Sequence, residues 1–252
     1  MDIYAFPPIA AILDAAYAGL MQLIALLEPL AGGAAAAASV LLVTLLVRAA
    51  LVPAGVSQAR AEQTRSRLAP KLRALQKRYG RDRERLQRET MKLYSDENTS
   101  PFAGCLPLLA QAPVIAIVYA LFAYPAISGH ANGLLTEQLL GVPLGASVVG
   151  ALAAGTATAA TFAVFGVLIA VIVVSAEVTR RAFRPPVPVT DDADASPLAN
   201  PGFLRAMGAL QFTTAVFALF VPLAAALYLT TTVVWTLVQR IVLRRRFPLV
   251  AG

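Results

Sequence analysis

The sequence predicts an all-α integral membrane protein: a helical bundle of five membrane spans, with the N-terminus outside and the C-terminus in the cytoplasm. Composition is the first reason. Of the 252 residues, 58% are hydrophobic and only 14% are charged, and the mean hydropathy is +0.68. A soluble domain carries about 25% charged residues. This chain therefore has too little charge to cover a water-facing surface.

The positions of the charges are the second reason. All 21 Lys and Arg residues fall in three blocks, 48–92, 180–205 and 240–246, separated by long segments without a basic side chain. Basic loops tend to stay on the cytoplasmic side of a membrane. The alternation therefore indicates membrane topology rather than nucleic-acid binding, although the net charge is +7.

The first segment, residues 1–32, is predicted to be an amphipathic helix lying on the outer face of the membrane. Its apolar residues recur at helical spacing, and its only charges are the acidic side chains of Asp2, Asp14 and Glu28. Two alternatives remain open, a sixth span and a secretory signal. A secretory signal needs a basic start, whereas this chain begins Met1-Asp2.

Five spans follow from the length of helix that a bilayer requires, which is about 20 apolar residues for roughly 30 Å of hydrocarbon. The uncharged run 206–239 would form a helix of about 51 Å, too long for one span. Pro222 near its centre is predicted to break it into two short spans. The predicted spans are 33–54, 101–124, 156–178, 206–221 and 223–242.

The segments between the spans are predicted to differ in structure. Residues 125–155 form an outer loop, and the proline-rich and acidic stretch within 179–205 indicates a flexible cytoplasmic linker. In residues 55–99, leucines at helical spacing on both sides of Gly80 predict two antiparallel helices in a cytoplasmic hairpin. Residues 243–252 form a short basic cytoplasmic tail.

The predicted hairpin is strongly basic, with twelve Lys and Arg against six Asp and Glu. Such a charge can attract anionic lipids, ribosomal RNA or acidic partners. A solvated arm that only enforces topology is the alternative interpretation. The candidate contact residues are Arg67, Lys71, Arg73, Lys77 and Arg78.

Arg48 lies inside the first predicted span, with apolar residues on both sides. Counting back from Pro53 places it about 7–8 Å from the cytoplasmic end. An arginine at a helix centre costs about 2.5–3.5 kcal/mol on insertion scales. Its guanidinium must therefore either extend to the cytoplasmic interface or lie in a water-filled cavity, and both interpretations remain open.

Other polar residues in the predicted spans favour the cavity. Thr44 lies one helical turn before Arg48, on the same face. Gln111 lies in the second span, Gln211 and Thr214 in the fourth, and Thr231 in the fifth. Each alone is more often an interhelical hydrogen-bonding residue than a ligand. Together with an unpaired arginine, they make a polar groove within the bundle a reasonable hypothesis.

Several of these residues and motifs resemble those of the YidC–Oxa–Alb family of membrane protein insertases. The matching parts are Arg48 in the first span, Met91-Lys92-Leu93-Tyr94 at the end of the hairpin, Pro101-Phe-Ala-Gly-Cys-Leu-Pro-Leu-Leu-Ala-Gln-Ala-Pro113, Leu227-Tyr228 and Gln239. The likeness runs from about Thr44 to Arg246, and its motifs are specific over 44–119. The five-span core of that family, with its N-terminus outside, agrees with the topology predicted from the charges.

The resemblance implies a shallow hydrophilic groove that is open to the cytoplasm and to lipid and closed to the exterior. The arginine matching Arg48 would attract acidic or polar parts of a nascent membrane protein, and Thr44 would line the groove. The substrate helix would then enter the bilayer without ATP. The expected groove residues are Arg48, Thr44, Gln111, Gln211, Thr214, Tyr228 and Thr231.

The resemblance also implies partners and a location. Nascent membrane proteins are the expected substrates, and the Sec translocon, the signal-recognition machinery, the ribosome and anionic lipids are further candidates. The short tail after Arg244 argues against tight ribosome binding. We expect a monomeric, multi-pass protein of the bacterial inner membrane.

Other classes of function receive less support from the sequence. No catalytic residue, metal or cofactor is expected, because the chain has no glycine-rich phosphate loop and neither His130 nor Cys105 has a catalytic partner at membrane depth. A small transporter would call for paired acidic residues or an inverted repeat, and neither is visible. An assembly chaperone without insertase activity would use the same groove, so that alternative stays open.

Overall fold

A computed structural model describes residues 7–80, 82–97, 116–117, 119–122, 124–127, 129–183 and 212–248. The described residues are mostly helical and divide into two compact units. Unit 1 comprises residues 1–48 and 115–237, and unit 2 comprises residues 49–114 and 238–252.

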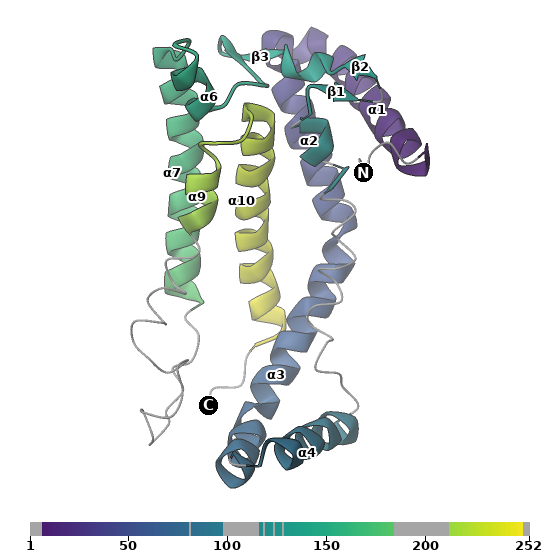
Figure 1. Ribbon diagram of the computed structural model, residues 1–252, viewed down its shortest axis with the longest axis vertical. Helices are drawn as coiled ribbons and strands as arrows, with labels where there is room; N and C mark the ends of the chain where they lie inside the picture. Colours follow the sequence, from purple (N-terminus) through teal and green to yellow (C-terminus); the bar gives the residue numbers. More distant parts are fainter. Residues whose placement is uncertain are drawn as a thin grey trace. The chain divides into compact units, whose positions relative to one another are not determined.

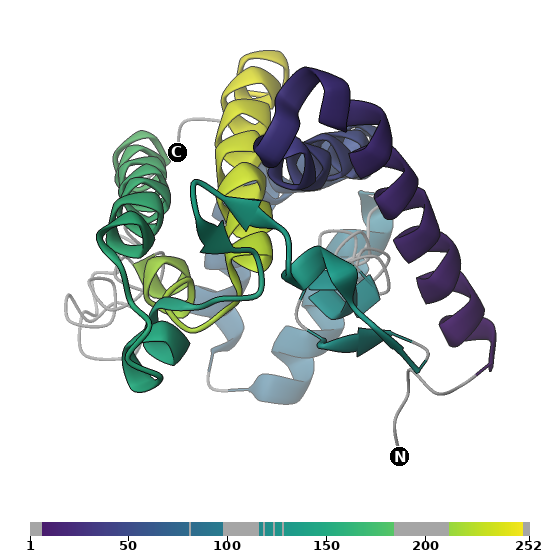
Figure 2. The same ribbon diagram turned by 90° about the horizontal axis from the view of Figure 1, so that it is seen from above.

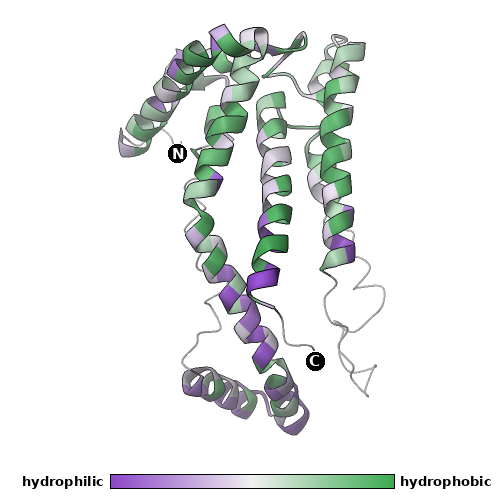
Figure 3. Cartoon of the chain, turned by 180° about the vertical axis from the view of Figure 1, so that it is seen from behind, coloured by the Kyte–Doolittle hydropathy of each residue, from purple (hydrophilic) through white to green (hydrophobic). Residues whose placement is uncertain are grey.

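Long helices dominate unit 1 (Figure 1). The long helices are α1 (Pro7–Ala31), α2 (Ala35–Ala50), α7 (Ala159–Ala182) and α10 (Leu223–Arg246). The last two residues of α2 and the part of α10 after Leu237 belong to unit 2. The short helices of unit 1 include η2 (Gly32–Ala34), α6 (Val148–Ala153) and α9 (Thr213–Phe217). Within the described residues, three helical stretches are long and apolar enough to cross a membrane: Pro7–Ala50, Ala159–Ala182 and Leu223–Arg246. Figure 3 shows their apolar character as green ribbon.

Two small antiparallel ribbons follow residue 124. Strand β1 (Ala126–Ile127) pairs with β2 (His130–Ala131), and β3 (Gln138–Leu139) pairs with β4 (Val142–Pro143). A short 3-10 helix, η3 (Gly133–Leu135), separates the ribbons. The sequence predicted only a loop for this region, because strands of two residues are too short to leave an alternating pattern.

Segment 124–158 packs at one end of unit 1, which we call the loop end (Figure 2). Strand β3 contacts η2, β4 contacts α7, and β1 contacts α1. The first backbone N–H groups of a helix have no partner within the helix. At the start of α10, Leu223 N donates to Ala146 O and Ala224 N donates to Leu144 O, each at 2.9 Å. The loop end thereby caps α10.

Side-chain oxygens fix where α6 and α7 begin. Ser147 accepts a hydrogen bond from Gly150 N at the start of α6. Thr158 and Thr161 form a capping box at the start of α7. Between the two helices, Gly155 has φ +68, which glycine adopts without steric cost. Helix α7 runs over Ala159–Ala182, where the sequence predicted a span at 156–178.

Unit 2 contains α3 (Val52–Tyr79), α4 (Arg83–Asp96) and the last residues of α10. Helix α3 begins with Pro at its N1/N2 position, where a missing N–H costs nothing. The Asp82 carboxylate accepts from Arg85 N and caps α4. Helix α3 begins directly after Leu51, within the predicted span 33–54 and before the predicted start of the hairpin at residue 55.

Several predicted elements lie outside the described residues. They are most of the predicted span 101–124, the first part of the predicted span 206–221, and most of the predicted linker 179–205. The described chain is therefore a mostly helical protein with three candidate spans. The five spans, their orientation and the extent of the hairpin stay predictions.

Candidate functional site

Arg48 and Thr44 both lie in the last two turns of α2. The Arg48 side chain is partly exposed and, among the described residues, makes no hydrogen bond or ion pair. Thr44 is only 2% exposed, and its hydroxyl donates to Val40 O at 2.6 Å within the same helix. Thr44 therefore has its hydroxyl proton bound to its own backbone.

Two further candidates lie on α10. The Tyr228 side chain is 9% exposed and packs against Phe122, with the ring centroids 6.3 Å apart. Thr231 donates its hydroxyl to Leu227 O at 2.8 Å. The neighbouring Thr232 hydroxyl oxygen is buried and has no hydrogen-bond partner among the residues that the structure describes.

Thr214 is half-buried in the first turn of α9. Helix α9 packs on α7, where Ala215 and Ala218 surround Ile172. Gln111 and Gln211 lie outside the described residues. Within the part of the chain that the structure describes, no hydrogen bond, ion pair or ring contact joins any two of the candidate groove residues.

Packing differs along α2 and α10. The start of α2 is buried over Ala35–Ala37 and Val40, and the start of α10 is buried over Leu223–Tyr228. Farther from the loop end the side chains become accessible, and Leu46 on α2 is 60% exposed. We call the region of unit 1 remote from the loop end the Arg48 end. No sequence pattern revealed this difference, because apolar residues occur along the whole of both helices.

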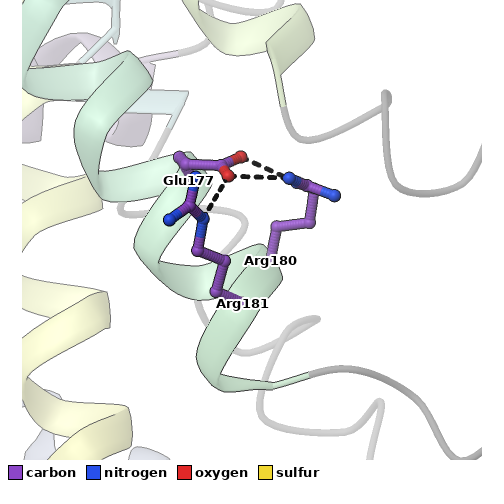
Figure 4. Close-up of polar contacts among 3 residues, drawn as sticks. All are labelled: Glu177, Arg180 and Arg181. Carbon is purple, nitrogen blue, oxygen red and sulfur yellow. Dashed lines mark hydrogen bonds and ion pairs between the residues drawn. The ribbon is translucent and has the colours of Figure 1, made fainter.

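An acidic residue in the last turns of α7 is already paired (Figure 4). The Glu177 carboxylate accepts two hydrogen bonds from Arg180, each at 2.7 Å, and one from Arg181 at 2.5 Å. Glu177 is thereby engaged by two cations of its own helix.

In unit 2, Glu97 joins α4 to α3. Its carboxylate pairs with Arg67 at 2.7 Å and with Lys71 at 2.5 Å. The hydrogen bond from Lys71 is the largest effect that lowers the pKa of Glu97 below its ordinary value, and the charges of Lys71 and Arg67 lower it further, whereas desolvation opposes them. Two of the five predicted contact residues are therefore bound to an acidic side chain of the same chain.

The other three predicted contact residues face water. Arg73, Lys77 and Arg78 are exposed on α3, and the Arg78 guanidinium lies 5.2 Å from the ring centroid of Tyr79. Arg85 approaches the same ring at 4.9 Å. Figure 3 shows α3 and α4 as predominantly hydrophilic. These side chains form a basic surface that an anionic partner can reach.

A second ionic contact in unit 2 was not anticipated from the sequence. Glu62 on α3 accepts hydrogen bonds from Arg240 at 3.2 Å and Arg244 at 2.9 Å on α10. Gln63 donates to Pro248 O at 3.0 Å. Gly55 belongs to the same contact, because a Cβ there would lie 1.7 Å from Gln239 Nε2. Opposite charges were the only signal available, and charge alone does not identify partners so far apart in sequence.

Comparison with known proteins gives the family. A sequence model of the family described as 60Kd inner membrane protein matches residues 27–249. The chain belongs to this family, the YidC–Oxa–Alb family. The resemblance noted from the motifs is thereby confirmed, and the chain is a multi-pass protein of the bacterial inner membrane.

Curated relatives agree with this assignment. The chain is 36% identical over 115 residues to "Membrane protein insertase YidC" of Clostridium perfringens, which covers 46% of this chain and 48% of that protein. It is 28% identical over 223 residues to the protein of the same name in Streptomyces avermitilis, covering 83% and 51%. It is 31% identical over 224 residues to "Inner membrane protein ALBINO3, chloroplastic" of Arabidopsis thaliana, covering 82% and 46%. The chain thus matches about half the length of these relatives.

Proposed function

We propose that this chain is a membrane protein insertase and chaperone, which receives nascent membrane proteins in a hydrophilic groove and releases their helices into the bilayer without ATP. The names of the bacterial relatives support the activity. The observation that carries the proposal is the difference in packing along α2 and α10, which are buried at the loop end and accessible toward Arg48. This is the asymmetry that a groove closed on one side of the membrane requires.

The proposed topology has five spans, with the loop end outside and the basic helix ends in the cytoplasm. Arg180 and Arg181 in the last turns of α7, and Arg244–Arg246 in the last turn of α10, support this orientation. The N-terminal helix α1 is proposed to lie on the outer surface. Its attachment to the loop end supports that placement, because Gly133 N donates to the Tyr17 hydroxyl at 2.9 Å.

Arg48 is proposed to attract acidic or polar segments of the substrate. A polar tail that crosses hydrocarbon must lose its hydration, and a hydrated groove removes part of that cost. The residues proposed to line the groove are Thr44, Thr214, Tyr228 and Thr231, with Gln111 and Gln211. The Thr231 hydroxyl proton is bound to its own helix, so this side chain offers an acceptor oxygen to a substrate donor. Hydrophobic burial of the substrate helix then drives its release into lipid.

The basic surface of α3, with Arg73, Lys77 and Arg78 exposed, is proposed to contact anionic lipids or the machinery that delivers substrates. The Sec translocon, the signal-recognition machinery and the ribosome are candidates for that role. The insertase itself is proposed to act as a monomer, without cofactor or catalytic residue.

Complementation tests the proposed activity. Cells depleted of their own insertase receive this chain or its Arg48→Ala, Arg48→Lys or Leu46→Ala variant, and protease protection reports insertion of a single-span substrate with an acidic tail. We expect the wild type, Arg48→Lys and the Leu46→Ala control to restore insertion. We expect Arg48→Ala to reduce it about tenfold or more, because the groove loses its cation.

Each outcome has a defined meaning. If Arg48→Ala restores insertion as well as the wild type, Arg48 is a side chain that merely reaches the interface, and its proposed role is wrong. If the wild type and all variants accumulate in the membrane and none of them restores insertion, the proposed insertase activity is wrong. An assembly chaperone would then be the better candidate, because it would use the same groove to hold polar segments.

A further inference from the structure

Helix α6 and its neighbours expose large apolar side chains near the loop end. Val149 and Leu152 on α6 are 40% and 55% exposed, Phe162 in the first turn of α7 is 51% exposed, and Phe220 after α9 is 59% exposed. We call these four side chains the α6 surface. Figures 1 and 2 show α6 beside the start of α7 and close to α9.

The backbone holds α6 in a defined position. On one side, Val149 N donates to Leu219 O at 3.2 Å, which ties α6 to the turn after α9. At its end, Gly155 N donates to Leu152 O and Thr156 N donates to Ala151 O, the pattern of a Schellman motif. This motif turns the chain directly into α7. The place of α6 relative to α7 and α9 is therefore set by hydrogen bonds rather than by a loose loop.

The accessible face of α6 has no polar or charged side chain. Val148 and Ala151 are buried, and the remaining residues of the helix are Val149, Gly150, Leu152 and Ala153. The sequence contains no charged residue between Glu137 and Glu177. A helix with one face in water normally places polar or charged residues on that face. An exposed apolar cluster of this kind marks an interaction surface.

Continuity with α7 identifies what the α6 surface contacts. Helix α7 is a candidate membrane span whose exposed face is also apolar, with Val167 64% and Val174 61% exposed. Its 24 residues extend for about 36 Å, close to the thickness of the hydrocarbon core. The α6 surface begins at the first turn of this span and therefore lies at the boundary between acyl chains and headgroups.

We propose that α6 is an interfacial helix whose Val149 and Leu152 side chains insert among lipid acyl chains, so that residues 148–153 belong to the membrane-embedded part of the protein rather than to an aqueous loop. The lipid contact follows from the α6 surface. The assignment of that leaflet to the outside rests on the proposed topology.

Site-directed labelling in the full-length chain tests this placement. Cys105 is the one cysteine and is replaced by Ser, and a new cysteine is introduced by Leu152→Cys or, as the control, by Gln138→Cys. Gln138 is an exposed polar residue of β3 in the same segment. We expect a membrane-impermeant maleimide to label position 152 at a rate at least about tenfold lower than its rate at position 138. An environment-sensitive fluorophore at 152, and not at 138, is expected to be quenched by phospholipid with a nitroxide near the headgroup.

Equal labelling rates at the two positions with no lipid quenching at 152 would overturn the proposal. Crosslinking of position 152 to a second copy of the chain, again without lipid quenching, would overturn it in favour of self-association. If position 138 is labelled only after permeabilisation while position 152 is still quenched, the lipid contact stands and the proposed topology fails.

A second pair of variants covers the case in which the cysteine-free chain does not accumulate. In the Trp235→Phe background, Leu152→Trp and the control Gln138→Trp provide intrinsic fluorophores, because Trp235 is the one tryptophan. We expect brominated phospholipid to quench the tryptophan at 152 and to leave that at 138 unchanged. The opposite pattern would overturn the proposal.

Discussion

The loop end of unit 1 and the paired helices of unit 2 are held together by different interactions. At the loop end, apolar side chains such as Leu134 and Leu144 are fully buried, and backbone hydrogen bonds cap α10. In unit 2, ion pairs of Glu62 and Glu97 join the helices. The partners of Glu97, Arg67 and Lys71, are largely exposed, whereas Arg240 and Arg244, the partners of Glu62, are partly buried. Exposed ion pairs contribute little and are screened by salt. The loop end is thus held by buried groups, whereas the exposed Glu97 ion pairs between α3 and α4 are open to screening by salt.

The largest effect is expected from breaking the loop end at Asn132. This buried side chain donates to Leu121 O at 2.8 Å and Tyr124 O at 2.9 Å, and accepts from Leu134 N at 3.2 Å. Asn132→Ala leaves these groups unpaired, at a cost of about 2–3 kcal/mol in the free energy of unfolding. Thermal unfolding in detergent measures this. An unchanged midpoint would mean that water or lipid satisfies the groups.

A smaller loss is expected from Gly145. A Cβ at this position would lie 2.8 Å from Leu135 Cβ and 2.9 Å from Leu135 O, so a side chain forces the backbone to move. Gly145→Ala should destabilise the protein by about 1–3 kcal/mol. Gly166→Ala in α7 is the matched control, because nothing lies within 4 Å of its Cβ, and it should not destabilise. Equal midpoints for the two variants would contradict tight packing at the loop end.

Leu140 offers a way to strengthen the loop end. It lies in the turn between β3 and β4 with φ 53 and is 77% exposed. A left-handed conformation costs a non-glycine residue about 1–2 kcal/mol. Leu140→Gly should therefore stabilise the protein by about 0.5–1 kcal/mol, measured by the same unfolding midpoint. The control Leu139→Gly, in the neighbouring strand residue, should do the opposite. A loss with Leu140→Gly would show that this side chain makes a contact outside the chain.

The smallest effect concerns Glu97 and pH. Because the folded pKa of this carboxyl is lowered, its stabilising contribution is fully present above the unfolded pKa of about 4.3 and is lost as the pH falls through the folded value. Amide exchange in α4, corrected for intrinsic rates, should therefore increase below about pH 4. Glu97→Gln should show the faster exchange already at pH 7. Glu84→Gln is the control, because Glu84 pairs with Arg88 of the same helix and does not join α4 to α3 within the described residues.

Patterns in single segments predicted the long helices, and contacts between segments accounted for most of what was missed. The apolar run after Thr156 predicted a span at 156–178, where α7 lies, and α10 begins at Leu223, directly after the break predicted at Pro222. The role of Asn132 was not predicted, because a lone asparagine in a loop gives no sign of which carbonyls it will meet. Glu62 was counted only as one charge in a basic segment, although it pairs with Arg240 and Arg244.

The predicted groove was harder to obtain from sequence than the helices. Spacing predicted that Thr44 and Arg48 share one face, but it could not show that Thr44 is buried and hydrogen-bonded to Val40 O. A hydroxyl in a helix has a backbone acceptor one turn away, and its choice depends on the local surroundings. The roles of the groove residues therefore stay proposals that the Arg48 variants can test.

The capping of α10 by the loop end has a mechanical consequence. A helix fixed at one end acts as a lever, and the displacement of any point grows with its distance from the fixed end. From Leu223 to Leu237, α10 extends for about 21 Å, so a tilt of about 10° at its start moves Leu237 by about 4 Å. That distance approaches half the width of a helix. Small rotations at the capped end are thus amplified into displacements of several ångströms at the far end of this segment.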